Sequence, residues 1–411
     1  MIKVNKPKIR FNKFENIWTK SKLGELYEIY SGNTPSRSDN RNYQNGEIPW
    51  IKTTDLNNSI ICSNEEKISV YGATKLKVLP EKSVLIAMYG GFNQIGRTGL
   101  LAYPATINQA LAALTPVNEI NPNFLLNFLN FKKENWRNVA ASSRKDPNIT
   151  KNDVEKFKIS FPSLDEQSAI GSLFCTLDDL LASYNDNLAN YQSLKATMLS
   201  RMFPKAGQTV PEIRLVGFEG EWKVQTLKEL ASFSKGNGYT KNDLVNSGKE
   251  IILYGRLYTN YQTVISQVNT FVTKVKANTV ISKGGEVIVP ASGESAEDIS
   301  RASVVEKSGV ILGGDLNIIY PDENKVDSIF LALTISNGSQ KKELIKRAQG
   351  KSVVHLRNND LEKVVLHYPS MEEQRAIGSY FANLDNLITS YQEKISQLET
   401  LKKKLLQDMF I

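Results

Sequence analysis

The chain of 411 residues has few of the side chains on which catalytic and metal sites commonly depend. It contains two cysteines, Cys62 and Cys175, and two histidines, His355 and His367. No group of Cys and His residues has the spacing of a zinc site. The cysteines occupy unrelated positions, so we expect two buried thiols rather than a disulfide, as in a protein from a reducing compartment.

Long apolar segments are also missing. No run approaches the roughly 20 residues that a transmembrane helix needs, and residues 1–6 lack the apolar core of a signal peptide. We therefore expect a cytoplasmic protein with no membrane partner. Hydrophobic residues make up 41% and charged residues 23% of the chain, which is typical of globular proteins, and the length predicts more than one domain.

Three segments resemble parts of catalytic motifs but lack a required residue or the required spacing. Asn121-Pro122-Asn123-Phe124 lacks the second proline of the amino-methyltransferase motif, and residues 90–96 lack the Lys-Ser/Thr that completes a P-loop. Residues 321–325 crowd into one turn the carboxylates that metal-dependent nucleases take from separated strands. We interpret these segments as a helix start, a hairpin and a loop. The sequence thus predicts a non-catalytic chain that binds no cofactor or metal.

The chain has a long internal repeat instead. Residues 162–172 (PSLDEQSAIGS) reappear 207 positions later as residues 369–379 (PSMEEQRAIGS). The start of each half also matches, because the Phe-Glu-x-x-Trp of residues 14–18 returns at residues 218–222. Two like halves predict a fold with a pseudo-twofold axis.

The middles of the two halves diverge but carry signals of an α+β fold. Residues 83–88 (SVLIAM) and 286–290 (EVIVP) are short apolar runs bounded by turn residues, typical of buried strands. Residues 124–129 and 329–333 begin helical patterns.

Each repeated segment predicts a long helix. Ser163-x-x-Glu166 and Ser370-x-x-Glu373 have the pattern of capping boxes. Apolar residues then recur with coiled-coil spacing, with a lysine (Lys195 or Lys402) at the same slot. About 38 residues at 1.5 Å per residue make a rod of roughly 57 Å. The alternative is an amphipathic helix on a globular core. The two seams are Ile170, Phe174, Leu177, Leu181, Tyr184, Leu188 and Tyr191, and Ile377, Phe381, Leu384, Ile388, Tyr391, Ile395 and Leu398.

Positive charge is concentrated in the first half. Residues 1–160 carry 23 basic and 14 acidic side chains, a net charge of +9, whereas residues 206–367 carry 20 and 18, a net charge of +2. Residues 161–205 and 368–411 together have a net charge of −3. A basic surface favours a polyanion such as DNA, although it also occurs in ordinary basic proteins. The distribution indicates that the repeated helices are not the nucleic-acid face.

The two Pro-Ser-x-[Asp/Glu]-Glu-Gln-x-Ala-Ile-Gly segments, the paired Phe-Glu-x-x-Trp openings and the duplicated order of divergent domain and helix resemble one family. The whole chain is similar to the DNA-specificity (S) subunit of a type I restriction–modification system. This resemblance implies an α+β fold with two target-recognition domains, residues 1–160 and 206–367. Residues 161–205 and 368–411 would form an antiparallel coiled coil. Each domain would read one half of a bipartite, asymmetric site in double-stranded DNA.

The resemblance also implies protein partners. The helices would dock two adenine-N6 methyltransferase (M) subunits, and nuclease–translocase (R) subunits would complete the restricting complex. S-adenosylmethionine, ATP and Mg²⁺ would be bound by these partners and not by this chain. Two alternatives stay open: a coiled-coil tether whose domains bind protein, and the recognition part of a methyltransferase or nuclease.

Four places in each half have the cationic and amide side chains with which proteins read DNA. They are residues 32–37 and 236–241, residues 90–97 and 292–301, residues 142–145 and 349–352, and Tyr43, Trp50 and Lys52 with Tyr254, Arg256 and Tyr258. Trp50 is expected to be a core residue, and an ordinary solvated loop is the alternative for each place. The candidate DNA-binding residues are Asn33, Arg37, Arg97, Arg144, Lys145, Asn237, Lys241, Arg256, Arg301 and Lys351.

Overall fold

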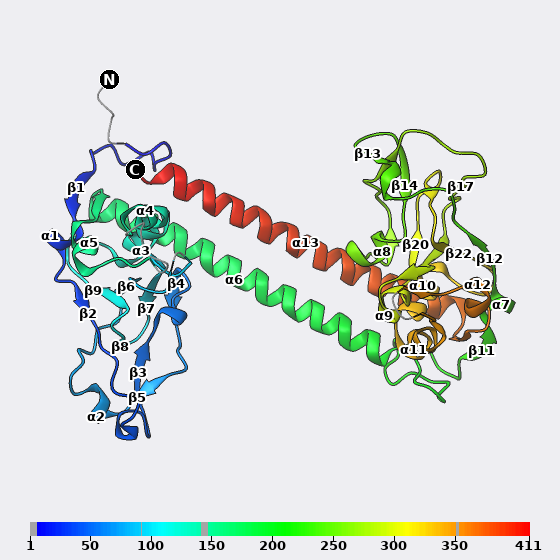
Figure 1. Ribbon diagram of the computed structural model, residues 1–411, viewed down its shortest axis with the longest axis horizontal. Helices are drawn as coiled ribbons and strands as arrows, with labels where there is room; N and C mark the ends of the chain where they lie inside the picture. Colours follow the sequence, from blue (N-terminus) through cyan, green and yellow to red (C-terminus); the bar gives the residue numbers. More distant parts are fainter. Residues whose placement is uncertain (1–5, 92, 141–146, 351–352) are drawn as a thin grey trace. The chain divides into compact units, whose positions relative to one another are not determined.

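The computed structural model describes residues 6–91, 93–140, 147–350 and 353–411. Contacts divide the chain into two compact units, Met1–Asn185 with Glu393–Ile411 (unit 1) and Asp186–Gln392 (unit 2). Each unit combines sheets, short helices and part of each long helix, as Figure 1 shows.

The main sheets of the two units have the same topology. In unit 1 the strand order is β2 (Tyr30–Ser31), β9 (Leu111–Leu114), β6 (Val84–Ala87), β7 (Thr98–Leu101) and β4 (Ser59–Ile61). In unit 2 it is β12 (Ala231–Lys235), β22 (Leu316–Pro321), β18 (Glu286–Pro290), β20 (Ser303–Val305) and β15 (Val264–Ile265). The last pair is parallel in both sheets and the other pairs are antiparallel. The divergent middles therefore fold alike, and β6 and β18 are the buried strands that the sequence predicts.

A second sheet lies beside each main sheet and is larger in unit 2. The strands in unit 1 are β5 (Lys67–Ile68), β3 (Ile48–Ile51) and β8 (Thr106–Ile107). Those in unit 2 are β13 (Leu244–Val245), β16 (Phe271–Val272), β14 (Lys249–Ile252), β21 (Ile311–Leu312) and β17 (Val280–Ile281). Two-stranded pairs are β1 (Thr19–Lys22) with β10 (Lys158–Phe161), β11 (Lys223–Thr226) with β24 (Val365–Tyr368), and β19 (Ser292–Gly293) with β23 (Val354–His355).

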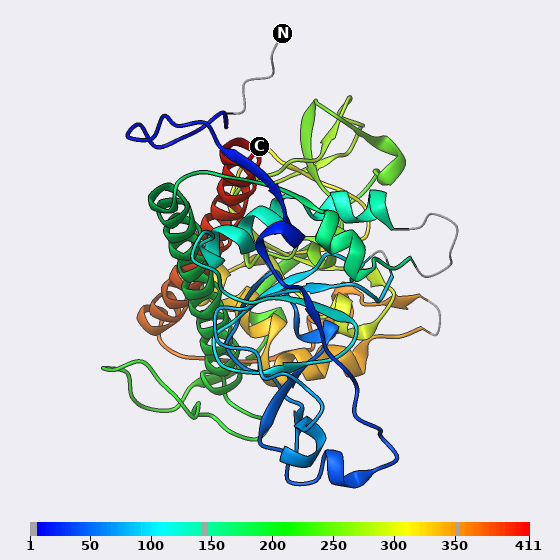
Figure 2. The same ribbon diagram turned by 90° about the vertical axis from the view of Figure 1, so that its left-hand side faces the viewer.

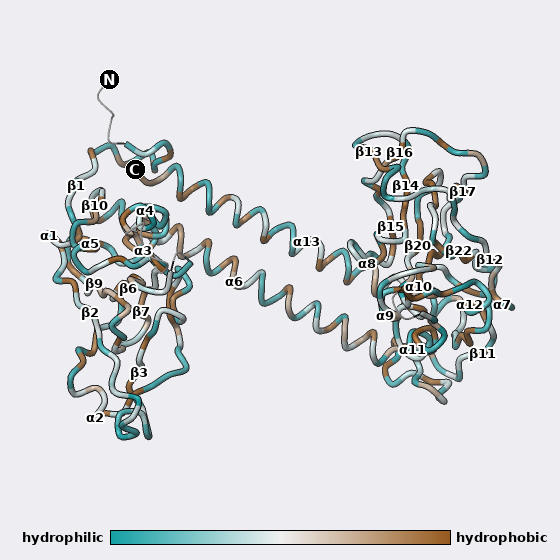
Figure 3. Tube along the Cα trace, in the orientation of Figure 1, coloured by the Kyte–Doolittle hydropathy of each residue, from teal (hydrophilic) through white to brown (hydrophobic). Residues whose placement is uncertain are grey.

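Short helices cover the sheets in both units. Unit 1 has α1 (Leu23–Leu26), α2 (Val70–Ala73), α3 (Pro122–Phe131), α4 (Lys133–Val139), α5 (Lys151–Lys156), η1 (Asn40–Asn42) and η2 (Thr53–Asp55). Unit 2 has α7 (Leu227–Leu230), α8 (Arg256–Thr259), α9 (Ala296–Ile299), α10 (Ser328–Ser336), α11 (Gly338–Arg347), α12 (Asn358–Leu361) and η3 (Lys241–Asp243). Figure 3 shows that apolar residues are common in the strands of each unit, while polar and apolar residues alternate along the long helices.

The long helices are α6 (Leu164–Arg201) and α13 (Met371–Met409), of 38 and 39 residues. In unit 1 the start of α6 packs in one apolar cluster with the end of α13. In unit 2 the end of α6 packs with the start of α13, and the rings of Tyr191 and Tyr391 lie 5.4 Å apart. Within each unit the helices are therefore antiparallel, which confirms the predicted pairing (Figure 1).

Burial along the seams is greatest where the helices meet the domains. Ile170, Phe174 and Leu177 are buried in unit 1, as are Ile377, Phe381 and Leu384 in unit 2. Ile395 is also buried, at 9% exposed. The remaining seam residues are half-buried: Leu181, Tyr184, Leu188, Tyr191, Ile388, Tyr391 and Leu398. This gradient fits two helices that cover only one face of each other away from the domains.

A phenylalanine just beyond each long helix enters the core of a unit. Phe410 follows α13 and contacts the rings of Trp18, Phe124 and Phe174 in unit 1 at 5.5 to 6.4 Å. Its repeat counterpart Phe203 follows α6 and contacts Trp222, Phe330 and Phe381 in unit 2 at 6.0 to 6.4 Å. Figure 2 shows the N-terminal segment crossing the end of α13, where the Ile9 N–H donates to the Asp408 carbonyl at 2.9 Å. The repeated tryptophans, Trp18 and Trp222, and the two phenylalanines are thus core residues.

The repeated Glu-Gln pair joins each long helix to its domain. Gln167 accepts the Asn121 N–H at 2.8 Å and donates to the Glu119 carbonyl at 3.0 Å. Gln374 likewise accepts the Asp327 N–H at 2.9 Å and donates to the Lys325 carbonyl at 3.0 Å. Asn121 and Asp327 are the N-caps of α3 and α10. Asn121 is therefore the helix start that the sequence predicts.

The glutamate of each motif has a different role from the predicted one. Glu166 is 1% exposed and accepts two hydrogen bonds from Arg10, each of 2.7 Å. Glu373 is bound in the same way by Arg214, at 2.7 and 2.6 Å. The predicted capping boxes are thus corrected: the arginines use both carboxylate oxygens, although the Ser370 hydroxyl does accept the Glu373 N–H at 3.3 Å.

The expectation for the cysteines holds in part. Both are free thiols, and Cys175 is half-buried. Cys62 is exposed, contrary to the prediction, because it follows β4 at the edge of the main sheet.

No helix in the described part of the chain is both long and apolar enough to cross a membrane.

Candidate nucleic-acid interface

In unit 1, two of the predicted places come together around Glu66. Its carboxylate forms ion pairs with Arg37 and Lys52, both of 2.5 Å. The Arg37 guanidinium also lies 4.3 Å from the Tyr43 ring and 5.3 Å from the Trp50 ring. The hydrogen bond from Arg37 and the charge of Lys52 hold the pKa of Glu66 below its ordinary value. The result is a half-exposed cationic and aromatic surface with a fixed carboxylate.

The neighbouring turn is held by the same aromatic residues. The Trp50 indole donates to the Asn33 carbonyl at 3.2 Å, and the Tyr43 hydroxyl donates to the Pro35 carbonyl at 2.5 Å. Trp50 is 2% exposed, which confirms it as a core residue. The Asn33 side chain is exposed, and its Oδ1 accepts the Thr34 N–H at 2.8 Å.

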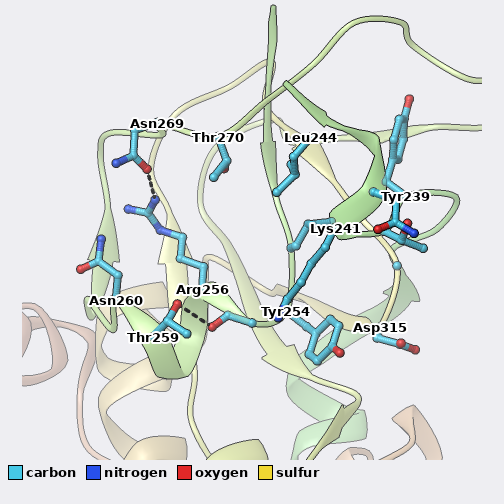
Figure 4. Close-up of a pocket in the computed structure, with 15 residues that line it drawn as sticks. Tyr239, Lys241, Leu244, Tyr254, Arg256, Thr259, Asn260, Asn269, Thr270 and Asp315 are labelled. Carbon is cyan, nitrogen blue, oxygen red and sulfur yellow. Dashed lines mark hydrogen bonds between the residues drawn. The ribbon is translucent and has the colours of Figure 1, made fainter. Parts of the chain in front are cut away.

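In unit 2, the corresponding places line a cavity of about 650 Å³. Lys241, Tyr254 and Arg256 all face it, as Figure 4 shows. Arg256, Asn260 and Asn269 lie on one side of the cavity and Tyr239 and Asp315 on the other. Asn237 is exposed beside this region and donates to the Asn278 carbonyl at 2.8 Å.

Arg256 is a half-buried cation held by neutral acceptors. Its Nη2 donates to Gln262 Oε1 at 2.8 Å and to the Gln267 carbonyl at 2.9 Å, and its Nη1 donates to Asn269 Oδ1 at 3.3 Å. Its Nε is buried without a hydrogen-bond partner among the described residues. Burial lowers the pKa of Arg256. A half-buried cation whose Nε–H has no partner favours an anion or a base edge with acceptors.

Tyr258 packs against this site rather than into it. Its ring lies 6.0 Å from that of Tyr254, in an edge-to-face arrangement. Burial raises the pKa of Tyr258 to about 12.

The predicted glycine-rich hairpin of unit 1 is present between β6 and β7. The Ala87 N–H donates to the Arg97 carbonyl at 2.8 Å, and the Gly96 N–H donates to the Ala87 carbonyl at 2.9 Å. Arg97 is half-buried and its Nε donates to the Asn93 carbonyl at 3.0 Å.

The counterpart in unit 2 replaces this hairpin with a helical turn. Ser295 caps α9, which has Glu297 and Asp298 in its first turn. Arg301 lies 3.9 Å from Asp298 and over the Tyr261 ring at 5.8 Å. Arg97 and Arg301 are therefore matched in position but differ in charge environment.

Arg144, Lys145 and Lys351 lie outside the described residues. Gln349 and His355 form a bridge whose N–H···O bonds measure 3.1 and 2.8 Å.

Sequence reasoning missed several residues of these surfaces. Glu66 comes from a different loop than Arg37, and Asn260 and Asn269 lie in the divergent part of unit 2. Lys133 of α4, which follows Lys132, feels the charges of Arg97 and Arg137. The run Lys132-Lys133-x-x-x-Arg137 was a sequence signal for the last group, whereas no local pattern marked the others.

The other motif fragments have structural roles. Residues 322–325 form a turn directly after β22, in which Lys325 pairs with Asp322 at 3.3 Å. Within the described ranges, no group of three or more His, Cys, Asp or Glu side chains could hold a metal ion.

Comparison with known proteins identifies the family. The family model of the type I restriction modification DNA specificity domain matches residues 15–190 and again residues 219–400. The chain belongs to this family and carries its domain twice. It is a non-catalytic specificity subunit with two DNA-recognition domains.

Individual relatives agree with this assignment. The type I restriction enzyme MjaVIII specificity subunit of Methanocaldococcus jannaschii is 21% identical over 405 residues, which cover 95% of this chain and 91% of the relative. The Escherichia coli EcoR124I/EcoR124II specificity subunit is 27% identical over 174 residues, covering 40% of this chain and 42% of the relative. A crystal structure of the S subunit from M. genitalium has the same fold, with a TM-score of 0.63, 16% identity and 99% of each chain covered.

Proposed function

We propose that unit 1 and unit 2 read different halves of a bipartite, asymmetric site in double-stranded DNA. Their recognition domains would be residues 1–160 and 206–367. The observation that carries this proposal is that one strand topology presents different chemistry at matched places. Unit 1 offers Arg37, Lys52 and a fixed Glu66 carboxylate, whereas unit 2 offers Lys241 and Arg256 in an amide-lined cavity.

These side chains suit different base edges. Arginine can donate two hydrogen bonds to guanine, asparagine pairs with adenine, and a carboxylate can accept from cytosine N4. Arg256, Asn260 and Asn269 supply the first two kinds in unit 2, and Glu66 supplies the third in unit 1. The two units are therefore expected to recognise two different half-site sequences on DNA, which we call the two words.

The long helices would set the separation of the two words and dock the partners. Half-sites about one turn apart, roughly 34–36 Å, would lie on one face of the duplex. The equivalent exposed faces of α6 and α13 would bind two adenine-N6 methyltransferase (M) subunits, and nuclease–translocase (R) subunits would join them. S-adenosylmethionine, ATP and Mg²⁺ would be bound by these partners, in the cytoplasm.

Mapping methylated adenines across the host genome tests this function. Cells with the wild-type chain should methylate one bipartite motif that disappears when the chain is deleted. Arg256→Ala should relax the choice at one position of one word by about 1–3 kcal/mol and leave the other word unchanged. Arg37→Ala, a variant of the candidate reading surface in unit 1, should affect only the other word.

Two results would contradict the proposal. If Arg256→Ala weakened all sequences equally, Arg256 would contact phosphate rather than a base. If the motif persisted after deletion of the chain, or if no duplex bound to the complex with the methyltransferase, a protein-binding tether would be the better account.

A further inference from the structure

Three cations gather at the β6–β7 hairpin and α4 of unit 1, and the base-reading residues proposed above include none of them. They are Arg97 at the end of the hairpin and Lys133 and Arg137 of α4, and the charges of Arg97 and Arg137 act on Lys133. We call them the basic patch. The one carboxylate of this helix is Glu134, which pairs with Arg137 at 2.9 Å. The hairpin itself, residues 88–97, contains no acidic residue.

The core of unit 1 fixes these cations in place. Gly96 lies against the Trp136 ring so closely that a Cβ atom there would be 2.3 Å from Trp136 Cδ1. Trp136 is fully buried and stacks on Phe157 at 4.0 Å. Because Gly96 adjoins Arg97 and Trp136 belongs to the same helix as Lys133 and Arg137, this contact holds the hairpin and α4 together.

The proximity of these like charges is unfavourable in the free protein. Burial lowers the pKa of Lys133, and the charges of Arg97 and Arg137 lower it further against the opposing effect of Glu134. Burial also lowers the pKa of Lys132, whose Nζ lies 4.6 Å from the centre of the Phe131 ring. An anion at this surface would relieve both the repulsion and part of the desolvation cost.

The matched surface of unit 2 also has an arginine and a lysine, but α9 replaces the hairpin and brings acidic residues. Arg301 takes the place of Arg97, and Lys341 of α11 takes the place of Lys133. Arg301 has Asp298 at 3.9 Å, and the charges of Glu297 and Asp298 oppose the lowering of the pKa of Lys341 by burial and Arg301. Glu297 and Asp298 thus offset part of the charge of Arg301 and Lys341, whereas no carboxylate of the β6–β7 hairpin does this for Arg97.

We propose that the basic patch of unit 1 is the principal backbone-phosphate anchor of the chain on DNA, and that the matched surface of unit 2 contributes little. This inference rests on the proposed DNA-reading function. The two units would then contribute unequally to binding, because unit 1 would supply most of the sequence-independent affinity for DNA. A regularly spaced row of phosphates suits several fixed cations, and each neutralised phosphate releases counterions from DNA.

Salt-dependent binding of a mixed-sequence duplex to the full-length chain tests this assignment. Fluorescence anisotropy would give the dissociation constant over a range of KCl concentrations for wild type, Arg97→Gln/Lys133→Gln and the matched Arg301→Gln/Lys341→Gln. We expect the unit 1 double variant to bind on the order of tenfold more weakly, with a log K against log salt slope smaller by about two. The unit 2 double variant should keep nearly the wild-type slope. Thermal unfolding of both variants checks that each is folded.

The other outcomes are distinct. Equal losses in the two double variants, or a loss only in the unit 2 variant, would overturn the unequal division. Unchanged binding by a folded unit 1 variant would assign the patch to an acidic protein surface instead. Failure of the wild-type chain to bind duplex at any salt concentration would count against the proposed function, and the inference would fall with it.

Discussion

Lys402 of α13 forms an ion pair with Asp178 of α6 in unit 1. The repeat places the same pair in unit 2, where Lys195 of α6 contacts Asp385 of α13. Each lysine is the polar residue that interrupts an apolar seam. The two pairs thus fix the register of antiparallel helices in both units, in the way that a single polar seam residue specifies register in other coiled coils.

Charge reversal tests the pairing in unit 1. Asp178→Lys would place two lysines opposite each other, and the double variant Asp178→Lys/Lys402→Asp would restore an opposite-charge pair. Because 32% of Asp178 and 23% of Lys402 are exposed, we expect a cost of about 1 kcal/mol or less for the single variant. That corresponds to a melting temperature lower by about 2–4 °C in a unit of this size. If the loss of stability in the double variant equalled the sum of the losses in Asp178→Lys and Lys402→Asp, the contact would not couple the helices.

The buried ion pair between Arg10 and Glu166 is expected to contribute far more to stability than the pair between Asp178 and Lys402. Glu166 is almost fully buried, so Arg10→Met would leave a carboxylate without its partner and cost about 3–5 kcal/mol in the free energy of unfolding. Arg10→Met/Glu166→Gln should recover much of this loss because the charge is then absent. Urea unfolding of the two variants measures the difference, and equal stabilities would contradict the role given to the buried charge. Arg214 and Glu373 provide the matched test in unit 2.

The contact between Gly96 and Trp136 predicts a position-specific effect of alanine. Gly96 has a φ of +71° and no room for a Cβ atom, whereas Gly91 has a φ of +74° and open space around it. Both substitutions place alanine in a left-handed backbone conformation, which costs about 1–3 kcal/mol in stability. Only Gly96→Ala also displaces Trp136. Thermal unfolding should therefore show a larger loss for Gly96→Ala than for Gly91→Ala. Equal losses would mean that the indole shifts without cost.

His367 is expected to make stability depend on acid pH. Its ring nitrogen Nδ1 lies 3.3 Å from Gln340 Nε2, and burial lowers its pKa from the ordinary value of 6.5 while Glu343 opposes this shift. A lowered pKa means that the folded state binds the proton more weakly than the unfolded chain. Its stabilising contribution is thus present above pH 6.5 and is lost as the pH falls.

Ser160 occupies the matched position in unit 1, which makes His367→Ser a natural control. The unfolding free energy of wild type should fall more steeply between pH 7 and pH 5 than that of His367→Ser. Parallel curves would show that His367 does not contribute to the acid sensitivity.

Local signals in the sequence predicted the elements well. The spacing of the seam residues indicated two helices of equal length, and Asn121 marked the start of α3. The apolar runs at β6 and β18 identified central strands. These features depend on neighbouring residues, so a sequence pattern is sufficient to find them.

Contacts between distant segments could not be predicted in this way. The Ser-x-x-Glu pattern indicated a capping box, but Arg10 lies 156 positions from Glu166 and competes for its carboxylate. Glu66 joins Arg37 to Lys52 only after β3 and β5 pair. The common topology of the divergent middles also had no sequence signal, because a shared sheet requires the same burial pattern and not the same residues.

The central claim is that two units read separate words at a distance set by the paired helices. Three heptads inserted between Asn185 and Asp186, with three more between Gln392 and Glu393, would lengthen both helices where the units divide. At 1.5 Å per residue the gain is about 32 Å, close to one turn of DNA. Duplexes selected from a random library by the complex with its methyltransferase should keep both words and gain about nine or ten unread base pairs. Selection of both words with the original spacing would contradict the account.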